Sequence, residues 1–435
     1  MNKFRKFWIL LSIIPIFITS AACQNMTTNA PTTIQTPSPI QTPPPLPKIV
    51  NFNEPKKYEY KPSDLPAPFG TESARRNSKI IPQPENAALT IPKGFKINVF
   101  AEGGFNVPRW MALAPNGDVF LADAGAKTLF VLRDSNKDGV AEERFVFSDK
   151  LDQPFGIAFY QDWVYVANTS SVVRFKYKSG QTKAEGEPEK LIELTRGGYN
   201  QHWTRNILFS PDGKKMYVSI GSSGNIDPEE DNRRAAISEY NPDGTGHRVY
   251  AWGLRNPIGL AWNPVTKELW TAVNERDGLG NDLVPDFVTS VKDGGFYGYP
   301  FYYIGENKEP RLKDIDYSKF PKVTVPDVLV TSHSAALGIV FNDKKMFPKE
   351  FENDAFVALH GSWNRQQLTG YKIIRIKMKN GKPVGGYEDF VSGWLPSEDS
   401  NEVWGRPVGL LMNSDGSLLI CDDGADKIWR VSYQK

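Results

Sequence analysis

One local pattern recurs six times along this chain, and this repetition constrains the fold more than any other feature. Each copy has a polar residue or proline, a small residue, an apolar strand, a turn and a second apolar strand. The copies start near residues 108, 153, 202, 256, 336 and 406. A repeat of about 40 to 50 residues with four strands per unit is typical of β-propellers, and the two longer spacings would hold inserted loops. We predict an all-β fold over residues 91–435, a six-bladed β-propeller of four-stranded antiparallel blades.

The segment before the first copy bears on how such a ring closes. Residues 95–100 read as a strand, Phe-Lys-Ile-Asn-Val-Phe, and the last copy ends at residue 431 with another. We expect the early strand to join the last blade, because this pairing would remove an open sheet edge. Two packed β-sandwiches are the alternative, although the composition does not change at a midpoint. The 36 Gly, 33 Pro, 11 Trp, 17 Tyr and 25 Phe suit many short strands joined by tight turns.

The first 22 residues look like a secretory signal. Basic residues at positions 3, 5 and 6 precede an apolar run from 7 to 18, which is short for a membrane span. Small residues and Cys23 follow and resemble a bacterial lipobox, in which Cys23 would carry lipid. Ser20 stands where that motif usually has Leu, so cleavage without lipid is the alternative. We expect an exported protein, periplasmic or an outer-membrane or cell-surface lipoprotein, that meets the membrane only through a lipid anchor at Cys23.

The region between the signal and the repeats has two parts. Residues 23–48 are rich in Thr, Pro and Gln and nearly uncharged, so they cannot bury enough surface to offset the entropy of ordering and read as a tether. Residues 49–90 include several aromatic side chains, and we expect this extended segment to pack on the propeller. Cys421 is the only cysteine besides Cys23, so no intramolecular disulfide is expected if Cys23 is lipidated.

Charge excludes one class of partner. The chain has 52 Lys and Arg against 50 Asp and Glu, with no basic run after the first few residues. Phosphate binding needs a concentrated basic patch, so we expect no nucleic-acid partner.

In a propeller the first strand of each blade lines the central channel, so residues that begin these strands converge at one end of the axis. Here they are mostly cationic or imidazole side chains, namely Arg109, His202, Arg255, His333 and Arg406, with Gln153 and Asn256. Cations brought together in a partly dry site repel one another unless an anion lies among them. An anionic ligand is therefore predicted. The alternative is that the arginines pair with acidic side chains elsewhere.

Several segments around these positions resemble the soluble pyrroloquinoline quinone (PQQ)-dependent sugar dehydrogenases, most closely the sorbosone or pyranose dehydrogenase branch. The resemblance spans residues 92–433, and its motifs lie at 199–202 (Tyr-Asn-Gln-His), 253–257 (Gly-Leu-Arg-Asn-Pro), 274–278 (Asn-Glu-Arg-Asp-Gly), 294–300 (Gly-Gly-Phe-Tyr-Gly-Tyr-Pro) and 360–365 (His-Gly-Ser-Trp-Asn-Arg). PQQ carries three carboxylates and is an anion of the predicted kind. The resemblance thus implies PQQ as the cofactor.

The resemblance also implies residue roles. His202 would be the general base that takes the sugar hydroxyl proton while hydride moves to the quinone. Two groups of side chains would bind the cofactor, the arginines on its carboxylates and the developing oxyanion and the amides on its ring edge. These cofactor-binding residues are Arg255, Asn256, Asn274, Asn364, Arg365 and Arg406, with Asn364 or Arg365 in the place of the family's cofactor-facing cation. The substrate pocket would include Gln201, His333, His360 and Trp363, with a structural role as the alternative for both histidines.

Calcium is the second cofactor that the resemblance implies, bridging quinone and protein as a Lewis acid. The family places backbone carbonyls of a Gly-Pro pair on this ion, whereas Glu275 and Arg276 stand at the matching positions here.

A separate calcium candidate comes from the residues alone. Asp134, Asn136 and Asp138, with Gly139 and then Glu142 or Glu143, follow the alternation of oxygen ligands in a calcium loop, but the twelfth position is Phe145. An ordinary Asp-Gly hairpin is the alternative.

The predicted function is that of a quinoprotein enzyme. It would oxidise a sugar, polyol or sugar aldehyde with PQQ as hydride acceptor and pass electrons to an external acceptor, a quinone or a cytochrome. One alternative is a calcium-dependent propeller lactonase or other hydrolase, which the scarcity of carboxylates at the channel mouth disfavours. The other is a propeller used as a non-enzymatic binding platform, because one fold hosts many functions.

Overall fold

The computed structural model describes residues 45–195 and 202–434. By its internal contacts the chain divides into residues 1–43 and 44–435, and every element below belongs to the second unit. The predicted signal, Cys23, most of the tether and Gln201 lie outside the described residues. In the part of the chain that is described, no helix is long and apolar enough to cross a membrane.

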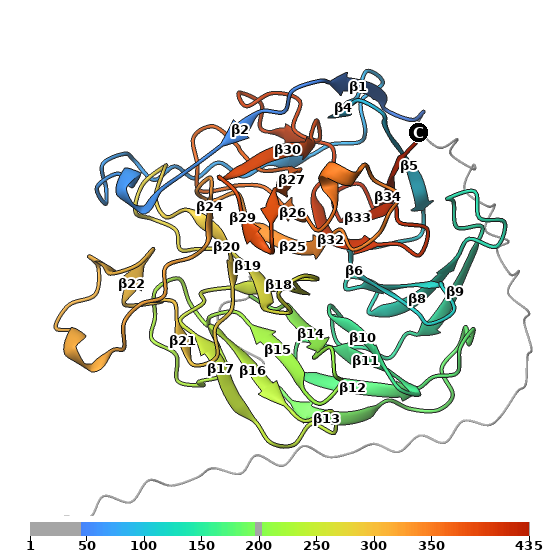
Figure 1. Ribbon diagram of the computed structural model, residues 1–435, viewed down its shortest axis with the longest axis horizontal. Helices are drawn as coiled ribbons and strands as arrows, with labels where there is room; N and C mark the ends of the chain where they lie inside the picture. The colour runs from blue at the N-terminus through green and yellow to red at the C-terminus, as the bar shows by residue number, and fades with distance from the viewer. Residues whose placement is uncertain (1–44, 196–201, 435) are drawn as a thin grey trace, which may run out of the picture. The chain divides into compact units, whose positions relative to one another are not determined.

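Six antiparallel sheets are arranged as blades around a central axis (Figure 1), which confirms the predicted six-bladed propeller and excludes the two-sandwich alternative. The first three blades, each in order from the axis outward, are as follows. Blade 1 has β6 (Pro108–Leu113), β7 (Val119–Asp123), β8 (Thr128–Arg133) and β9 (Glu143–Ser148). Blade 2 has β10 (Ile157–Tyr160), β11 (Trp163–Ala167), β12 (Ser171–Lys176) and β13 (Glu189–Glu193). Blade 3 has β14 (Arg205–Phe209), β15 (Met216–Ile220), β16 (Ala236–Tyr240) and β17 (Arg248–Trp252), with β21 (Gly295–Phe296) added in parallel.

The other three blades follow the same plan. Blade 4 has β18 (Pro257–Trp262), β19 (Leu269–Val273), β20 (Asp286–Ser290) and β24 (Val328–Val330). Blade 5 has β25 (Ala336–Phe341), β26 (Ala355–Leu359), β27 (Lys372–Ile376) and β30 (Tyr387–Val391), with β2 (Lys57–Tyr58) at its outer edge. Blade 6 has β32 (Pro407–Met412), β33 (Leu418–Asp422), β34 (Lys427–Tyr433) and β5 (Phe95–Glu102).

The last blade closes the ring with a strand from the start of the propeller. β5 pairs antiparallel with β34, from Phe95 opposite Tyr433 to Glu102 opposite Lys427. The predicted closure is confirmed. Its physical effect is that the two ends of the repeat region share one sheet, in which β5 covers the edge that β34 would otherwise leave unpaired.

The small residue in the repeat pattern has a packing reason. A Cβ on Gly338 would lie 2.2 Å from the Val408 carbonyl oxygen of the next inner strand, and a Cβ on Gly409 would lie 2.4 Å from the Arg109 carbonyl oxygen. Gly156 and Gly259 face their neighbours in the same way. Glycine at this position therefore lets adjacent inner strands approach closely around the channel.

The hydrophobic core lies mainly between neighbouring blades. Phe120 of β7 illustrates this, because its ring centroid lies 5.1 Å from that of Phe147 in its own blade and 5.0 Å from that of Phe159 in blade 2. Phe120 is fully buried, and truncating such a side chain typically costs about 3 to 5 kcal/mol. Blade-to-blade packing of this kind stabilises the ring without a disulfide.

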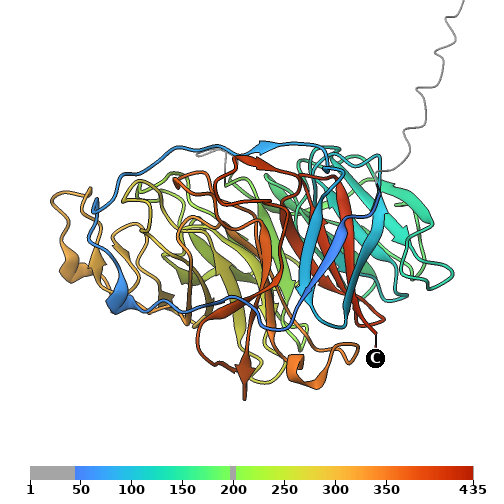
Figure 2. The same cartoon turned by 90° about the horizontal axis from the view of Figure 1, so that it is seen from above.

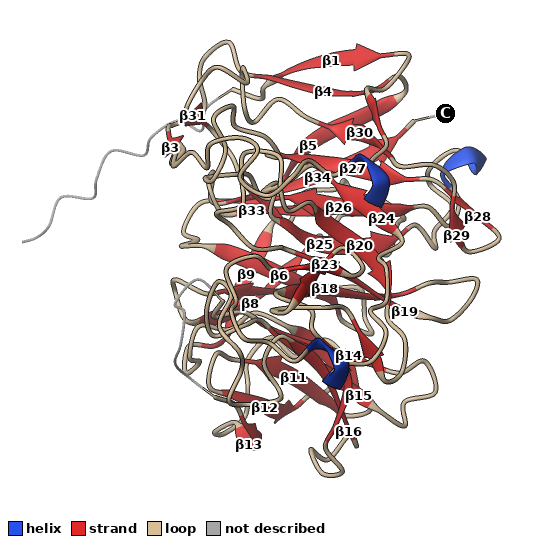
Figure 3. Ribbon diagram, turned by 90° about the vertical axis from the view of Figure 1, so that its left-hand side faces the viewer, coloured by secondary structure: helices blue, strands red, loops and turns tan. Residues whose placement is uncertain are grey.

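The segment before the propeller runs along one end and the edge of the ring (Figure 2). It contributes β1 (Lys48–Phe52), which pairs in parallel with β4 (Ala88–Pro92), and β3 (Lys79–Ile80), which pairs in parallel with β31 (Glu402–Val403). The remaining elements of the described residues are two hairpins and three short 3₁₀ helices. They are β22 (Tyr302–Tyr303) with β23 (Asn307–Lys308), β28 (Met378–Lys379) with β29 (Lys382–Pro383), and the helices Pro62–Asp64, Tyr317–Lys319 and Lys349–Phe351. Figure 3 shows the helices in blue among strands and loops.

Candidate functional site

The two ends of the central channel differ in character. A cavity of about 510 Å³ follows the inner strands and is lined along most of its length by apolar side chains such as Met111, Ile207, Leu260, Ile339 and Leu410. The charged and imidazole residues predicted from the sequence gather instead at the end where these strands begin. They form two groups, one on blades 3 and 4 and the other on blades 1, 5 and 6.

His202 is the centre of the first group. It stands just before β14 and is only 4% exposed. Its Nδ1 lies 3.0 Å from the Ser222 carbonyl oxygen and 2.9 Å from Ser222 Oγ. A carbonyl oxygen can only accept, so Nδ1 carries the proton and the neutral ring has its lone pair on Nε2. Burial, followed by the charge of Arg255, lowers the pKa of His202 well below 6.5, which keeps the ring neutral at pH 7.

The loop after β15 holds this ring in place. Ser222 Oγ donates to the Gly224 carbonyl at 2.6 Å, and Arg234 Nη1 donates to the Ser222 carbonyl at 3.1 Å. A Cβ on Gly221 would lie 2.1 Å from Asn256 Oδ1, so only glycine fits there. His202, Ser222 and Asn256 are thereby packed together by residues from two blades.

Arg255 is the cation of the first group and is 1% exposed. Its guanidinium donates to oxygens of Asn225, Asn274, Glu275 and Asp277, the shortest bond being 2.7 Å to the Glu275 carbonyl. Only Asp277, at 3.4 Å, bears a charge. The alternative that the arginines pair with acidic side chains therefore holds in part for Arg255. Asn274, predicted to bind the cofactor, lies beside this guanidinium.

His333 adjoins the same group through Asp277. Its Nε2 donates to the Gly280 carbonyl at 3.0 Å, and its Nδ1 lies 3.4 Å from Asp277 Oδ1. Burial alone would lower its pKa, but Asp277 outweighs burial and the pKa of His333 is raised. The charged form of His333 is thus stabilised relative to a free imidazole, whereas that of His202 is destabilised.

The second group is a chain of ion pairs across blades 1, 5 and 6. Asp423, just after β33, accepts from Arg109 of β6 and from His360, which follows β26; the His360 Nε2 lies 2.9 Å from Asp423 Oδ1. On the other side of the His360 imidazole, Arg406 Nη2 lies 3.0 Å from His360 Nδ1. Arg109 also lies over the Trp203 ring, with its guanidinium carbon 5.3 Å from the centroid. Asp423 and Arg406 therefore meet on one imidazole, and Arg109 joins them through Asp423.

These partners decide the protonation of His360. Arginine only donates, so Nδ1 accepts from Arg406 and the Nε2 proton is donated to Asp423. Burial and then Arg406 lower the pKa of His360 to about 4. Burial raises the pKa of Asp423, but His360 and Arg109 together hold it below its usual range. Both ring nitrogens of His360 are hydrogen-bonded to protein side chains. Its place in the sugar pocket stays a prediction.

Several buried polar atoms at this end have no hydrogen-bond partner among the described residues. They include two donors on cations, Arg109 Nε and Arg406 Nε, and one acceptor, Asn256 Oδ1. Buried polar groups without partners are uncommon in folded proteins and often mark a ligand position. Donors on cations and an acceptor on an amide suit an anion that also presents a donor, and PQQ, with carboxylates and a ring N–H, has that chemistry.

The predicted residues of the 360–365 segment bind other parts of the protein. Asn364 Oδ1 accepts from Gly278 N at 3.0 Å and its Nδ2 donates to Ala74 O at 2.6 Å. Arg365 donates to Asn281 and pairs with Asp282 at 2.8 Å. The Trp363 carbonyl accepts from the backbone N of Arg76. These residues join the N-terminal segment to the loop that carries Asp277, and their roles toward cofactor and substrate stay predictions.

The residues matched to the family's calcium site do not fit a calcium ion. Arg276 is fully buried and pairs with Glu275 at 2.9 Å and Glu309 at 3.4 Å. The Glu275 carbonyl already accepts from Arg255. A divalent cation on this carbonyl would lie against the Arg255 guanidinium, and like charges in a buried site are costly.

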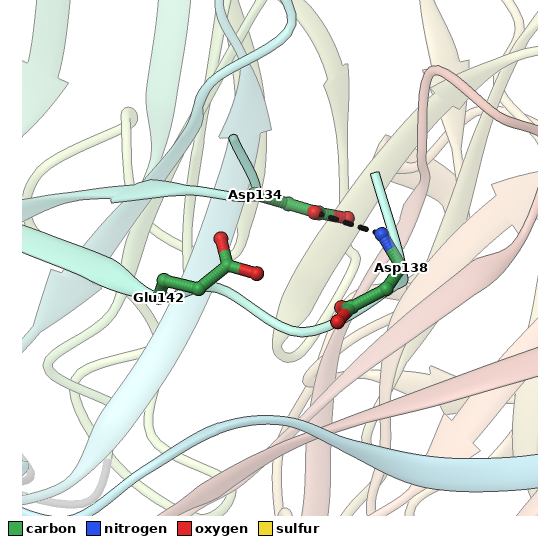
Figure 4. A group of neighbouring side chains, drawn as sticks. All are labelled: Asp134, Asp138 and Glu142. Atoms are coloured by element: carbon green, nitrogen blue, oxygen red, sulfur yellow. Dashed lines mark hydrogen bonds between the residues drawn. The ribbon is translucent and has the colours of Figure 1, made fainter. Parts of the chain in front are cut away.

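The second calcium candidate lies away from the axis, between β8 and β9 (Figure 4). One oxygen each of Asp134, Asp138 and Glu142 lie within 4.8 Å of one another. Asp134 accepts from the backbone N of Asp138 and of Gly139, and the Asn136 amide donates to Asp138 at 3.1 Å. The hairpin alternative accounts for these bonds, and a calcium ion here stays a prediction.

Sequence reasoning missed Asp423, Ser222, Asn225 and Asp277. Asp423 directly follows β33, and Ser222 lies two residues after β15, so both follow the second strand of a blade. The sequence prediction considered only residues that begin the first strand of each blade. The doubled acid Asp422-Asp423 in the last copy is a signal that could have been used. Asn225 and Asp277 lie in irregular loops, where no periodic pattern marks them.

Known proteins resemble this chain over most of its length. An uncharacterized protein from Borreliella burgdorferi is 29% identical, over 80% of this chain and 92% of that protein. A Coprinopsis cinerea protein named pyrroloquinoline quinone-dependent pyranose dehydrogenase is 21% identical, over 80% of this chain, and the chain spans 55% of its length. A Hypocrea jecorina protein named pyrroloquinoline quinone-dependent sugar dehydrogenase is 23% identical, over 75% of this chain and 85% of that protein.

Solved structures agree in fold. The calcium structure of a Trichoderma reesei carbohydrate-active enzyme of family AA12 has a TM-score of 0.69 at 19% identity, over 82% of this chain and 99% of that one. The holo form of the pyranose dehydrogenase PQQ domain from Coprinopsis cinerea has a TM-score of 0.66 at 21% identity, over 81% and 98%. At this level of identity the likeness shows the propeller fold alone.

A family model described as TrAA12-like matches residues 89–288 and 308–434, well over half of the chain. This match, with the named relatives, confirms the resemblance predicted from the sequence. The chain belongs to the TrAA12-like family.

Proposed function

We propose that this protein is a PQQ-dependent dehydrogenase that oxidises a sugar, a polyol or a sugar aldehyde. The observation that carries the proposal is the pairing, at one end of the channel, of a buried neutral His202 with cations whose Nε donors have no partner. The names of the Coprinopsis and Hypocrea relatives support the same chemistry.

This proposal gives a role to each residue of the site that is named below. Arg406 and Arg109 bind the cofactor's negative groups through their unpartnered Nε donors, and Asn256 Oδ1 accepts a hydrogen bond from it. PQQ, when bound, supplies the carbon that accepts a hydride from the substrate. His202 Nε2 takes the hydroxyl proton of the sugar, while Nδ1–H stays on the Ser222 oxygens and fixes the ring. Arg255 lies beside the base and stabilises negative charge that develops on the substrate oxygen.

No step of the proposed reaction uses calcium, because the Glu275 carbonyl and carboxylate are both bonded to guanidinium groups. The hydrolase alternative has little support at this site, because Asp277 and Asp423, the carboxylates in contact with its histidines, are both paired with cations. A metal-dependent hydrolase would need such oxygens on its metal.

Reconstitution tests the proposal. The full chain is titrated with PQQ while its tryptophan fluorescence and visible spectrum are recorded, and reduction of an artificial electron acceptor is followed with a panel of sugars, polyols and sugar aldehydes. We expect saturable PQQ binding and sugar-dependent reduction. A chain that binds no PQQ and shows no turnover with any substrate would overturn the proposal, and hydrolysis of a lactone without PQQ would favour the hydrolase.

We also propose that the protein is exported and anchored by lipid at Cys23, on the sequence pattern of residues 1–23. Radiolabelled palmitate added to cells should label the wild type and not a Cys23→Ser variant, and the label should fractionate with membranes. Recovery of the unlabelled wild type in the soluble periplasmic fraction would contradict the anchor, and recovery in the cytoplasm would contradict export.

A further inference from the structure

A cavity of about 380 Å³ lies on the outer rim of blade 3, apart from the axial site. Ile220 pairs with Ala236, which pairs with Trp252, so the end of the outer strand β17 lies at the same end of the propeller as Ser222. Aromatic rings of Trp252, Tyr299 and Phe301 line the cavity. None of the site residues predicted from the sequence lies among the described residues that line it.

The charges in this cavity select the kind of ligand. Glu229 and Arg234 both line it. An anion would be repelled by the carboxylate and a cation by the guanidinium, so the arrangement favours a neutral molecule.

One carboxylate oxygen of Glu229 has no hydrogen-bond donor among the described residues. Its Oε1 accepts from Ser223 N at 2.8 Å, whereas its Oε2 is buried and has no hydrogen-bond partner among the described residues. Burial raises the pKa of Glu229. An unpartnered buried oxygen is costly, and a hydroxyl donor from a ligand would satisfy it. Asn232, also in the lining, can both donate and accept.

The aromatic walls are flat and supported from behind. Phe301 stacks on Phe320 with 4.1 Å between ring centroids, and Trp252 stacks on Phe296 at 4.0 Å. Flat apolar walls beside a few polar groups suit a ring that has C–H faces and hydroxyl edges. A phenol offers a single hydroxyl, whereas a sugar ring has several and can bond to Glu229 and Asn232 together.

We propose that this cavity binds a neutral sugar ring in its pyranose form, at a second position distinct from the axial site. The inference deepens the proposed function and rests on it for the link to sugar oxidation. The lining residues also hold the loop that orients His202. Arg234 donates to the Ser222 carbonyl at 3.1 Å, Tyr299 Oη donates to the Gly224 carbonyl at 3.1 Å, and Glu229 accepts from Ser223. A sugar in the cavity would therefore restrain the residues that position the base.

Calorimetric titration of the cofactor-free full chain with D-glucose, cellobiose and phenol tests the site. We expect both sugars to bind and phenol not to. Glu229→Gln should weaken sugar binding about tenfold or more, as expected for a hydrogen bond to a charged group, and Asn232→Ala should weaken it less. Glu230→Gln, a neighbouring exposed carboxylate, is the matched control and should bind sugar like the wild type.

The outcomes separate this inference from the proposed function. Absence of sugar binding by the cofactor-free chain, or binding that neither Glu229→Gln nor Asn232→Ala weakens, would overturn the cavity as a sugar site even if PQQ turnover is observed. Binding of phenol in preference to sugars would overturn the ligand class. Sugar binding that depends on Glu229 in a chain without PQQ turnover would keep the cavity and overturn the dehydrogenase. Asn232, which is exposed, serves as the second variant if Glu229→Gln does not fold.

Discussion

Two buried histidines at the same end of the channel have lowered pKa values but opposite tautomers. His202 donates from Nδ1 to the Ser222 oxygens, so the lone pair of its neutral ring is on Nε2. His360 donates from Nε2 to Asp423, and its Nδ1 accepts from Arg406. The protonated nitrogen of each ring is set by its partner.

This difference separates two roles for one residue type. The tautomer of His202 suits a base, because its basic nitrogen is the one directed away from the Ser222 loop. His360 connects Asp423 to Arg406 and has both nitrogens bonded to protein groups, so it positions Arg406, the arginine that we propose binds the cofactor. A lowered pKa alone would not have distinguished the two.

The largest expected effect comes from His202→Ala. General-base catalysis typically contributes about 10²- to 10⁴-fold, so kcat should fall by that factor while PQQ affinity is retained. Steady-state kinetics and a fluorescence titration with PQQ measure the two quantities. His247→Ala is the control, because His247 lies in a hairpin of blade 3 and bonds Ser238. Retention of full turnover in His202→Ala would show that the base is another group.

His360 should make stability depend on pH. Its pKa is about 4 in the folded protein and about 6.5 when unfolded, so above pH 7 it is neutral in both states. As the pH falls below 6.5, this histidine becomes protonated in the unfolded chain while it stays neutral in the folded chain. The free energy of unfolding should thus drop by about 3 kcal/mol by pH 4. Urea unfolding at pH 7 and 4.5 measures this.

His360→Gln, in the same two urea series, isolates the contribution. The variant should lose distinctly less stability between the two pH values than the wild type. Equal losses in the two proteins would mean that His360 is already protonated in the folded state at pH 4.5, contrary to its pairing with Arg406.

Asp423→Asn should weaken the second group with a smaller effect. The change keeps the shape but removes the charge that Arg109 and His360 share, so Arg406 loses its fixed orientation. We expect PQQ affinity to fall about tenfold, the size of one charge-assisted hydrogen bond, with a smaller change in kcat. Asp343→Asn, at the exposed far end of the channel, should change neither. A loss of kcat without loss of PQQ affinity would place Asp423 in the chemical step.

The smallest effect should come from Ser222→Ala. The hydroxyl is one of two acceptors for His202 Nδ1, and the carbonyl remains. Loss of one neutral hydrogen bond costs about 1 kcal/mol, so kcat should fall about fivefold with PQQ affinity unchanged. A loss as large as that of His202→Ala would mean that the carbonyl alone does not hold the ring.

The fold was predictable from sequence because the repeat reports on packing directly. Gly338 and Gly409 recur where adjacent inner strands nearly touch, and the predicted starts at 256, 336 and 406 lie within one residue of the start of β18, β25 and β32. The convergence of His202, Arg255 and Arg406 at one channel end followed from the same geometry, since all three precede an inner strand.

The partners of these residues were not predictable in the same way. Ser222 is 20 residues from His202, and Asp423 is 63 residues from His360. Both lie at strand ends or in loops, where the polar residues follow no period. Arg276 shows the limit most plainly, because a residue aligned with a metal site turns out to be buried between Glu275 and Glu309.

The sequence by itself determined the ring, its closure and the set of cations and histidines that meet at one end, because alternating strands and close-packed glycines are local requirements. Only the tertiary structure decided which nitrogen of each histidine holds its proton and which arginines keep a donor without a partner. Those properties depend on hydrogen-bond partners from other blades, and the blades come together only when the ring forms.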